Sequence, residues 1–160
     1  MANLEPLIQS IPVAPLKLAS LEGCRTLADQ VNNYLVSFRH ESPTNVGQAD
    51  SLQGYCADSY LLECECPRFG SGEGKGVLKE SVRGCDLFIM VDVTNYSLTY
   101  RVNGYENHMS PDNHYQDLKR IISAADGNAR RINVIMPFLY EGRQHKRTKR
   151  ESLDCALMLQ

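Results

Sequence analysis

A nearly continuous apolar run, residues 86–93, most constrains how this chain can fold. It reads Asp-Leu-Phe-Ile-Met-Val-Asp-Val. A strand with one face in water alternates apolar and polar residues, whereas a strand of a parallel sheet that is covered on both faces is apolar almost throughout. The run therefore predicts a central covered strand, and a covered parallel sheet in turn requires helices on its faces.

Amphipathic helices and shorter strands surround this run. Apolar residues recur at helical spacing in residues 22–40 and in the segment that begins with Ser110-Pro111. Ser20 is the expected N-cap of the first helix and Ser110 that of the second, which Gly127 is expected to close. The remaining strands are expected at residues 16–19, 60–66, 77–82 and, as a buried strand, 132–136. This order of elements predicts an α/β fold with a mainly parallel sheet.

Two glycine-containing segments predict antiparallel hairpins. Residues 68–76 hold four glycines at alternate positions between two expected strands, without the G-x-G-x-x-G spacing and following helix of a dinucleotide site. Asn103-Gly104 lies between alternating apolar residues and is typical of a two-residue hairpin turn. Two other segments are expected to be irregular, an extended arm at residues 1–15 and a long loop at 42–57.

The stretch after strand 132–136 is the main candidate for a binding site. Five of the eight residues from Arg143 to Arg150 are Lys or Arg, and one more is His. Ligands of α/β proteins bind outside the carboxyl ends of parallel strands, so this charge favours a di- or triphosphate. Thr148 and Glu151 fit a capping box, which would direct the N-terminal donors of a following helix to the same place. Charge alone favours a solvated surface, a nuclear localisation signal or a nucleic-acid patch, and it is the position after a buried strand that shifts the balance toward a phosphate site.

Composition excludes several classes of protein. The net charge of -2 argues against a chain that coats nucleic acid, and no apolar run approaches the length of a membrane span. The six cysteines include no C-x-x-C pair, and without a signal peptide they indicate reduced thiols in a cytoplasmic protein. Cys64 and Cys66 would share one face of a strand, but no second pair or His lies nearby. We therefore expect no metal site within the chain.

Several segments, in order along the chain, resemble the ribose-phosphate diphosphokinases, also called phosphoribosyl pyrophosphate synthetases. Residues 80–89, Glu-Ser-Val-Arg-Gly-Cys-Asp-Leu-Phe-Ile, resemble that family's E-S-V-R-G-x-D-V-[FY]-I segment. The other matches are Arg68–Glu73 with R-F-S-D-G-E, Asp112-Asn113 with the D-N-L-M-E-L-L helix, 137–147 with the P-Y-F-x-Y-A-R-Q-D-[RK]-[RK] loop, and 151–157 with the P-I-[ST]-A-K-L helix start. They cover about residues 68 to 160, with weaker support from 16 to 39.

The resemblance implies a type I phosphoribosyltransferase-like fold, with a mainly parallel sheet flanked by helices and an antiparallel hairpin. It also implies a transferase of nucleotide biosynthesis, in which ATP donates diphosphate to O1 of ribose 5-phosphate, giving phosphoribosyl pyrophosphate and AMP. Mg²⁺ would be required. The protein would be a cytoplasmic homo-oligomer, with no nucleic-acid or membrane partner.

The resemblance implies particular ATP-binding residues as well. Phe69 would stack on the purine and Glu73 would accept a hydrogen bond from the adenine amino group, at the site of a neighbouring subunit; the sequence alone favours a core position for Phe69. The whole ATP-binding set would be Arg143, Gln144, His145, Phe69, Ser71 and Glu73. Possible further phosphate contacts are Lys146, Arg147 and Arg150.

The chain departs from the family pattern at two of these positions. His145 stands where Asp follows Arg-Gln in the family, and Ser71 replaces an acidic residue. Insertions are expected near residues 41–57 and 96–109, and the basic loop is about one residue shorter. These differences bear on the purine and ribose contacts, and His145 is either a phosphate contact or a solvated residue.

The domain organisation expected from the resemblance is an arm at residues 1–15 and an N-terminal phosphoribosyltransferase-like domain at 16–160, truncated at its C-terminus. The family's metal-binding D-x-H segment, ribose 5-phosphate loop and catalytic loop have no counterpart here, so no catalytic residue is expected and the chain alone should be inactive. An alternative is a non-catalytic, synthetase-associated regulatory or assembly subunit. The presence of those three segments in the parent protein would favour the enzyme.

Overall fold

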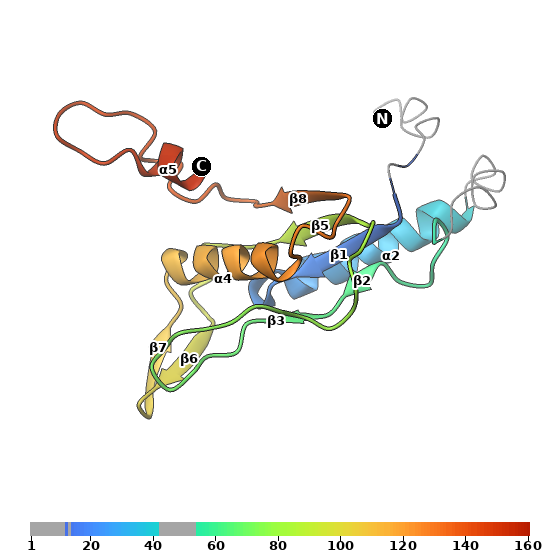
Figure 1. Cartoon of the computed structure of the whole chain (residues 1–160), viewed down its shortest axis with the longest axis horizontal. Helices are drawn as coiled ribbons and strands as arrows, with labels where there is room; N and C mark the ends of the chain where they lie inside the picture. Colours follow the sequence, from blue (N-terminus) through green and yellow to red (C-terminus); the bar gives the residue numbers. More distant parts are fainter. Residues whose placement is uncertain (1–11, 13, 42–53) are drawn as a thin grey trace.

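The computed structural model describes residue 12 and residues 14–41 and 54–160. Its centre is a parallel four-stranded sheet in the order β2-β1-β5-β8, with a helix against each face (Figure 1). These elements are β1 (Leu16–Ser20), β2 (Leu61–Leu62), β5 (Asp86–Met90), β8 (Arg131–Ile135), α2 (Arg25–Glu41) and α4 (Pro111–Ala124). The predicted α/β fold is confirmed. The remaining elements are η1 (Glu22–Cys24), β3 (Cys64–Glu65), β4 (Val77–Leu78), β6 (Thr99–Val102), β7 (Tyr105–His108) and α5 (Asp154–Met158).

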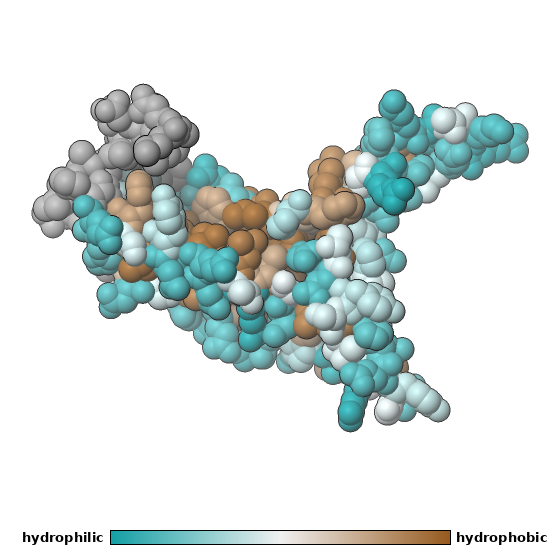
Figure 2. All heavy atoms as spheres, turned by 180° about the vertical axis from the view of Figure 1, so that it is seen from behind, coloured by the Kyte–Doolittle hydropathy of each residue, from teal (hydrophilic) through white to brown (hydrophobic). Residues whose placement is uncertain are grey.

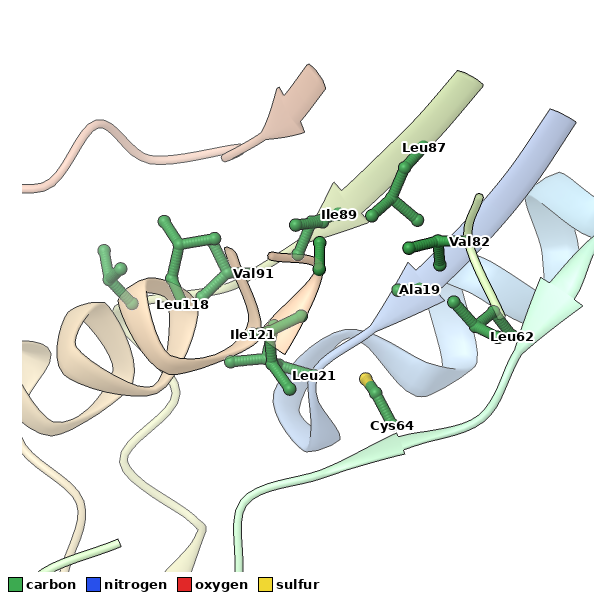
Figure 3. Close-up of a cluster of buried hydrophobic side chains, with 12 residues drawn as sticks. Ala19, Leu21, Leu62, Cys64, Val82, Leu87, Ile89, Val91, Leu118 and Ile121 are labelled. Carbon is green, nitrogen blue, oxygen red and sulfur yellow. The ribbon is translucent and has the colours of Figure 1, made fainter. Parts of the chain in front are cut away.

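The core is built on β5, as its apolar composition predicts. Leu87 and Ile89 are fully buried and pack with Leu118 and Ile121 of α4 (Figure 3). The alternate residues of the strand face α2, where Met90 packs with apolar residues of β1 and α2. Because burying one such side chain contributes about 1.5–3 kcal/mol, both faces of β5 contribute to the stability of the fold.

The prediction of a strand at 132–136 is confirmed, but the expectation that it is buried is wrong. β8 pairs with β5 and is the last strand of the sheet among the described residues. Val134 and Ile135 remain 42% and 37% exposed. Figure 2 shows hydrophobic surface over the middle of the domain and hydrophilic surface over the projecting arm that follows β8. An apolar run thus indicates a strand here without saying whether both of its faces are covered.

The start of α4 agrees with the sequence, whereas its end differs in detail. Ser110 Oγ accepts from the backbone N–H of Asn113 at 3.2 Å, and the Asn113 side chain accepts from the Ser110 N–H at 3.0 Å. Pro111 occupies the first turn, so the predicted cap is confirmed. The first left-handed residue after the helix is Asp126 (φ 48), and Gly127 (φ 63) follows it. The chain therefore leaves the helical conformation at Asp126, one residue before the predicted Gly127.

Ser20 is not an N-cap, so that prediction is wrong. It is the last residue of β1, where it is paired with Met90, and its hydroxyl donates to the Leu21 carbonyl at 3.0 Å. The chain enters α2 through the short 3-10 turn η1, whose N-cap, Leu21, has no side-chain hydrogen bond. Pairing with β5 keeps the backbone extended for one residue longer than the helical pattern suggests.

The predicted strand at 60–66 is divided between two sheets. β2 extends the parallel sheet beside β1, whereas β3 leaves it to pair antiparallel with β4. Of the strand predicted at 77–82, only Val77–Leu78 forms a strand, β4. The glycine-rich link between two antiparallel strands is confirmed, and so is the hairpin of β6 and β7. Asn103 (φ 50) and Gly104 (φ 84) both have the positive φ that a tight two-residue turn requires.

The expectations for the N-terminal arm and the long loop fall largely outside the described residues, which omit 1–11, 13 and 42–53. Among the helices that are described, none combines the length and apolar content needed to span a membrane.

Candidate functional site

Contacts of two tyrosines, Tyr140 after β8 and Tyr115 on α4, hold the segment after β8 against helix α4. The Tyr140 ring stacks on the Tyr115 ring, with centroids 4.4 Å apart and planes inclined by 9°. The Tyr140 hydroxyl donates to Asp112 Oδ1 at 2.6 Å, and the Tyr115 hydroxyl donates to the Met158 carbonyl at 2.6 Å. The bond to the Asp112 carboxylate, together with burial, raises the pKa of Tyr140, so its hydroxyl remains a donor. Both ends of the basic loop are therefore held against one helix.

Gln144 closes the neck of this loop. Its side-chain amide donates to the Ser152 carbonyl at 2.9 Å, and its backbone carbonyl accepts from the Cys155 N–H at 3.3 Å. Before it, the Gly142 N–H donates to the Leu139 carbonyl at 3.1 Å, and a Cβ at position 142 would lie 3.1 Å from that same oxygen. The predicted ATP-binding residue Gln144 thus positions the loop through its side-chain amide.

Beyond the neck, residues 145–151 project from the domain as an open loop, called the basic arm below (Figure 1). Its cations, including Arg143 at the neck, are exposed and lie outside an adjoining apolar groove of about 320 Å³. Within the described part of the chain none of them forms an ion pair; they are Arg143, Lys146, Arg147, Lys149 and Arg150. His145 is exposed too, with Nδ1 3.2 Å from the Gly142 carbonyl. Unpaired cations of this kind are suited to phosphate oxygens.

The predicted capping box at Thr148 and Glu151 does not begin a helix, although the helix expected after it is present as α5, whose Cys155 N–H donates to the Gln144 carbonyl. Glu151 does accept hydrogen bonds from the Thr148 N–H at 3.2 Å and from the Thr148 hydroxyl at 3.1 Å. No helix begins there, because residues 148–152 are exposed and have no face to bury. α5 begins only at Asp154, is five residues long, and its N-cap Leu153 makes no side-chain bond.

The second group of predicted residues lies on the turn between β3 and β4. The Phe69 N–H donates to the Glu73 carbonyl at 2.7 Å, and the Ser71 hydroxyl donates to Glu73 Oε2 at 2.8 Å. Phe69 is 53% exposed, so the core position that the sequence alone favours is wrong. The turn presents an aromatic face and a carboxylate oriented by Ser71.

A buried ion-pair network that sequence analysis missed anchors this turn. Arg68 donates to both Asp117 carboxylate oxygens, at 2.7 and 2.8 Å, and Arg120 donates to one of them at 2.6 Å. The Asp117 and Arg68 side chains are only 6% and 9% exposed. The sole signal in the sequence is an acidic residue beside Leu118, on the helix face that packs into the core.

Two of the alternating glycines have a packing role here. A Cβ at Gly74 would lie 2.5 Å from Nη1 of Arg68, which the buried Asp117 holds in place, and one at Gly76 would collide with the Arg120 carbonyl. The chain can therefore pass close to α4 only without side chains at these positions.

The two groups of predicted ATP-binding residues lie apart in one chain. Figure 1 shows the arm after β8 and the hairpin region on different sides of α4. The structure brings Phe69, Ser71 and Glu73 together on one turn, and it places Arg143 to His145 at the neck of the arm. One chain does not join the two groups.

The cysteines are free, as expected of reduced thiols. Cys64 Sγ donates to the Ser20 carbonyl at 3.2 Å and Cys66 Sγ to the Asp117 carbonyl at 3.8 Å. Burial raises the pKa of Cys64 to about 11 and that of Cys66 to about 12, so neither supplies a thiolate at neutral pH. Over the described residues, no three His, Cys, Asp or Glu side chains converge to hold a metal ion. These residues thus offer no all-protein cage for the Mg²⁺ that the resemblance implies.

Comparisons with known proteins agree with the resemblance seen in the sequence. The model of the N-terminal domain of ribose phosphate pyrophosphokinase matches residues 16–160. Curated ribose-phosphate pyrophosphokinases of Corynebacterium ammoniagenes and Bacillus cereus are each 30% identical over 145 residues, which is 89% of this chain and 34% of the relative. The chain thus spans about a third of the length of these relatives.

A solved structure supports the fold. The phosphoribosylpyrophosphate synthetase from Mycobacterium smegmatis matches with a TM-score of 0.55 at 23% identity, over 90% of this chain and 37% of the other. With the parallel sheet, its flanking helices and the antiparallel hairpins, this identifies the fold as type I phosphoribosyltransferase-like. The family match over residues 16–160 shows that the chain belongs to the ribose-phosphate pyrophosphokinase family and corresponds to its N-terminal domain.

Proposed function

We propose that this chain is the ATP-side domain of a cytoplasmic ribose-phosphate diphosphokinase. In the whole protein, O1 of ribose 5-phosphate attacks the β-phosphorus of ATP. The bond from that phosphorus to the oxygen bridging to the α-phosphate breaks, AMP leaves with that oxygen, and O1 gives up its proton. The products are phosphoribosyl pyrophosphate and AMP.

The observation that carries the proposal is the set of exposed, unpaired cations on the arm that follows β8. A cluster of like charges is unfavourable unless solvent or an anion compensates it, and a triphosphate supplies that compensation. Arg143 precedes Gln144 at the anchored neck, and its planar guanidinium would bind two phosphate oxygens. His145, Lys146, Arg147 and Arg150 are the further candidate contacts on the arm.

The turn at residues 69–73 would bind the adenine. An exposed Phe69 ring can stack on a purine, and the Glu73 carboxylate can accept a hydrogen bond from the exocyclic amine. Because this turn and the arm lie apart in one chain, the nucleotide would be shared between two copies. One copy would hold the phosphates and its neighbour the base, which requires a homo-oligomer.

The residues of this chain then act by binding and orientation. Transfer of a phosphoryl-type group depends mainly on holding the reactants in line and neutralising charge on the phosphate oxygens. The cations of the arm would neutralise the phosphate charge, and the anchored neck would help to hold the reactants in line. Mg²⁺ would accompany ATP, as the resemblance implies.

The test compares Arg143→Ala with Arg130→Ala in the full-length protein. Both arginines are exposed, but Arg130 precedes β8 and lies at its opposite end. Loss of a charge-assisted contact to phosphate should weaken ATP binding about tenfold in Arg143→Ala, measured by calorimetry, and Arg130→Ala should bind as the wild type does. Equal ATP affinities for the two variants would contradict the site assignment.

A product assay separates the enzyme from the regulatory alternative. The full-length protein, given ATP and ribose 5-phosphate, should release AMP and phosphoribosyl pyrophosphate. Binding of ATP that depends on Arg143, without release of AMP, would instead assign a non-catalytic regulatory or assembly subunit.

A further inference from the structure

The β6–β7 hairpin and the turn at residues 69–73 form one projecting lobe (Figure 1). The Arg68 guanidinium carbon lies 5.2 Å from the centroid of the Tyr100 ring of β6. At Gly72 (φ +91), a Cβ would lie 3.2 Å from Cγ2 of Val102. Because Arg68 is itself held by the buried Asp117, the two hairpins share a rigid base. They should therefore move and bind as a unit.

A hollow of about 710 Å³ lies between the two hairpins. Ser71 and Glu73 line one wall, and Tyr100, Tyr105 and Asn107 line the other, with Arg120 of α4 also contributing. The hollow therefore includes the carboxylate that the proposed function assigns to the adenine amine, together with the aromatic residues Tyr100 and Tyr105 of the β6–β7 hairpin.

Tyr105 is the distinctive member of this group. It is 77% exposed, although a large aromatic side chain that had only a structural role on the hairpin would gain by burial. Tyr96, on the segment leading into the same hairpin, is 67% exposed, but its ring stacks on that of His108 at 4.3 Å and does not line the hollow. The two tyrosines thus differ in surroundings and not in exposure.

We propose that Tyr105 is a specificity-determining residue that contacts the base of the bound nucleotide, which makes the β6–β7 hairpin part of the purine site. This rests on the proposed function, because it takes Glu73 as the partner of the exocyclic amine. A ring from the opposite wall offers a stacking surface, and stacking is stronger for a purine than for a pyrimidine because the shared surface is larger.

The test measures binding of ATP and CTP to the full-length protein and to its Tyr105→Ala, Tyr105→Phe and Tyr96→Ala variants. Tyr105→Ala should weaken ATP binding about fivefold or more and CTP binding less, which lowers the ratio of the two affinities. Tyr105→Phe keeps the stacking surface and should restore the ratio. Tyr96→Ala should match the wild type.

Failure of this inference can be distinguished from failure of the proposed function. Arg143→Ala should weaken ATP and CTP equally, since both carry the triphosphate. Suppose that Arg143→Ala weakens both nucleotides equally, but that the ratio of ATP affinity to CTP affinity is the same in Tyr105→Ala as in Tyr96→Ala. Tyr105 then makes no base contact, and the inference is overturned. If the wild type binds neither nucleotide, the proposed function is overturned.

Discussion

Asp117 offers the sharpest test of how the lobe formed by the turn at residues 69–73 and the β6–β7 hairpin is held together. Its carboxylate accepts three hydrogen bonds, two from Arg68 and one from Arg120, and it is almost fully enclosed. In Asp117→Ala, the Arg68 guanidinium would remain buried with the Tyr100 ring as its neighbour and no anion to balance it. The cost of that buried charge dominates the expected effect.

The magnitude follows from the burial of each group. Removing one partner of a buried ion pair costs about 3–5 kcal/mol. Arg120, whose side chain is 20% exposed, can turn toward water, so its bond adds little. We expect Asp117→Ala to lower the free energy of unfolding by about 3 kcal/mol, a large part of the roughly 5–15 kcal/mol typical of a domain. The double variant Arg68→Met/Asp117→Leu replaces both charges by apolar groups and should recover most of the loss.

Urea unfolding followed by far-UV circular dichroism measures these differences, since the chain has no Trp to report fluorescence. Asp29→Ala, at an exposed position on α2, is the matched control and should change little. The reasoning would be refuted if Asp117→Ala lost less than about 1 kcal/mol, or if the double variant were as unstable as the single one.

Two further predictions concern glycine and cysteine. Gly76→Ala should lower the free energy of unfolding by about 1–3 kcal/mol, because its Cβ meets the Arg120 carbonyl. Gly70→Ala, which has open space around its Cβ, should be near neutral in the same urea assay. Equal effects of the two substitutions would contradict the packing role of Gly76. Burial raises the pKa of Cys64 to about 11 and that of Cys66 to about 12 from 9.0, so the stability they contribute is complete below pH 9 and is lost as pH rises through those values. The melting temperature should fall more steeply above pH 9 in the wild type than in Cys64→Ala/Cys66→Ala, and parallel curves would contradict this.

Features that depend on neighbours in sequence were predictable. The covered strand at 86–90, the Ser110 cap and the Asn103-Gly104 turn each follow from the local preferences of a few consecutive residues. The position of the basic loop was predictable for a similar reason, because a strand and the segment after it are consecutive in the chain. The family resemblance then supplied the residues of the candidate site.

Features that depend on packing between distant segments could not be predicted from the sequence. Nothing in the local sequence distinguishes an edge strand from a covered one, so the exposure of β8 was missed. The capping pattern of Thr148 and Glu151 formed its hydrogen bonds without a helix, because a cap stabilises a helix only where a buried face supports it.

The sequence by itself determined the order of strands and helices, the two hairpin turns and the concentration of positive charge after the last strand, since all three are set by residues close together in the chain. Only the tertiary structure decided that Gln144 closes the neck of the basic arm, that Asp117 holds Arg68, and that the arm and the hairpin lobe lie on different sides of α4. Those outcomes arise from contacts between segments far apart in the chain, whose energies exist only once the chain has packed.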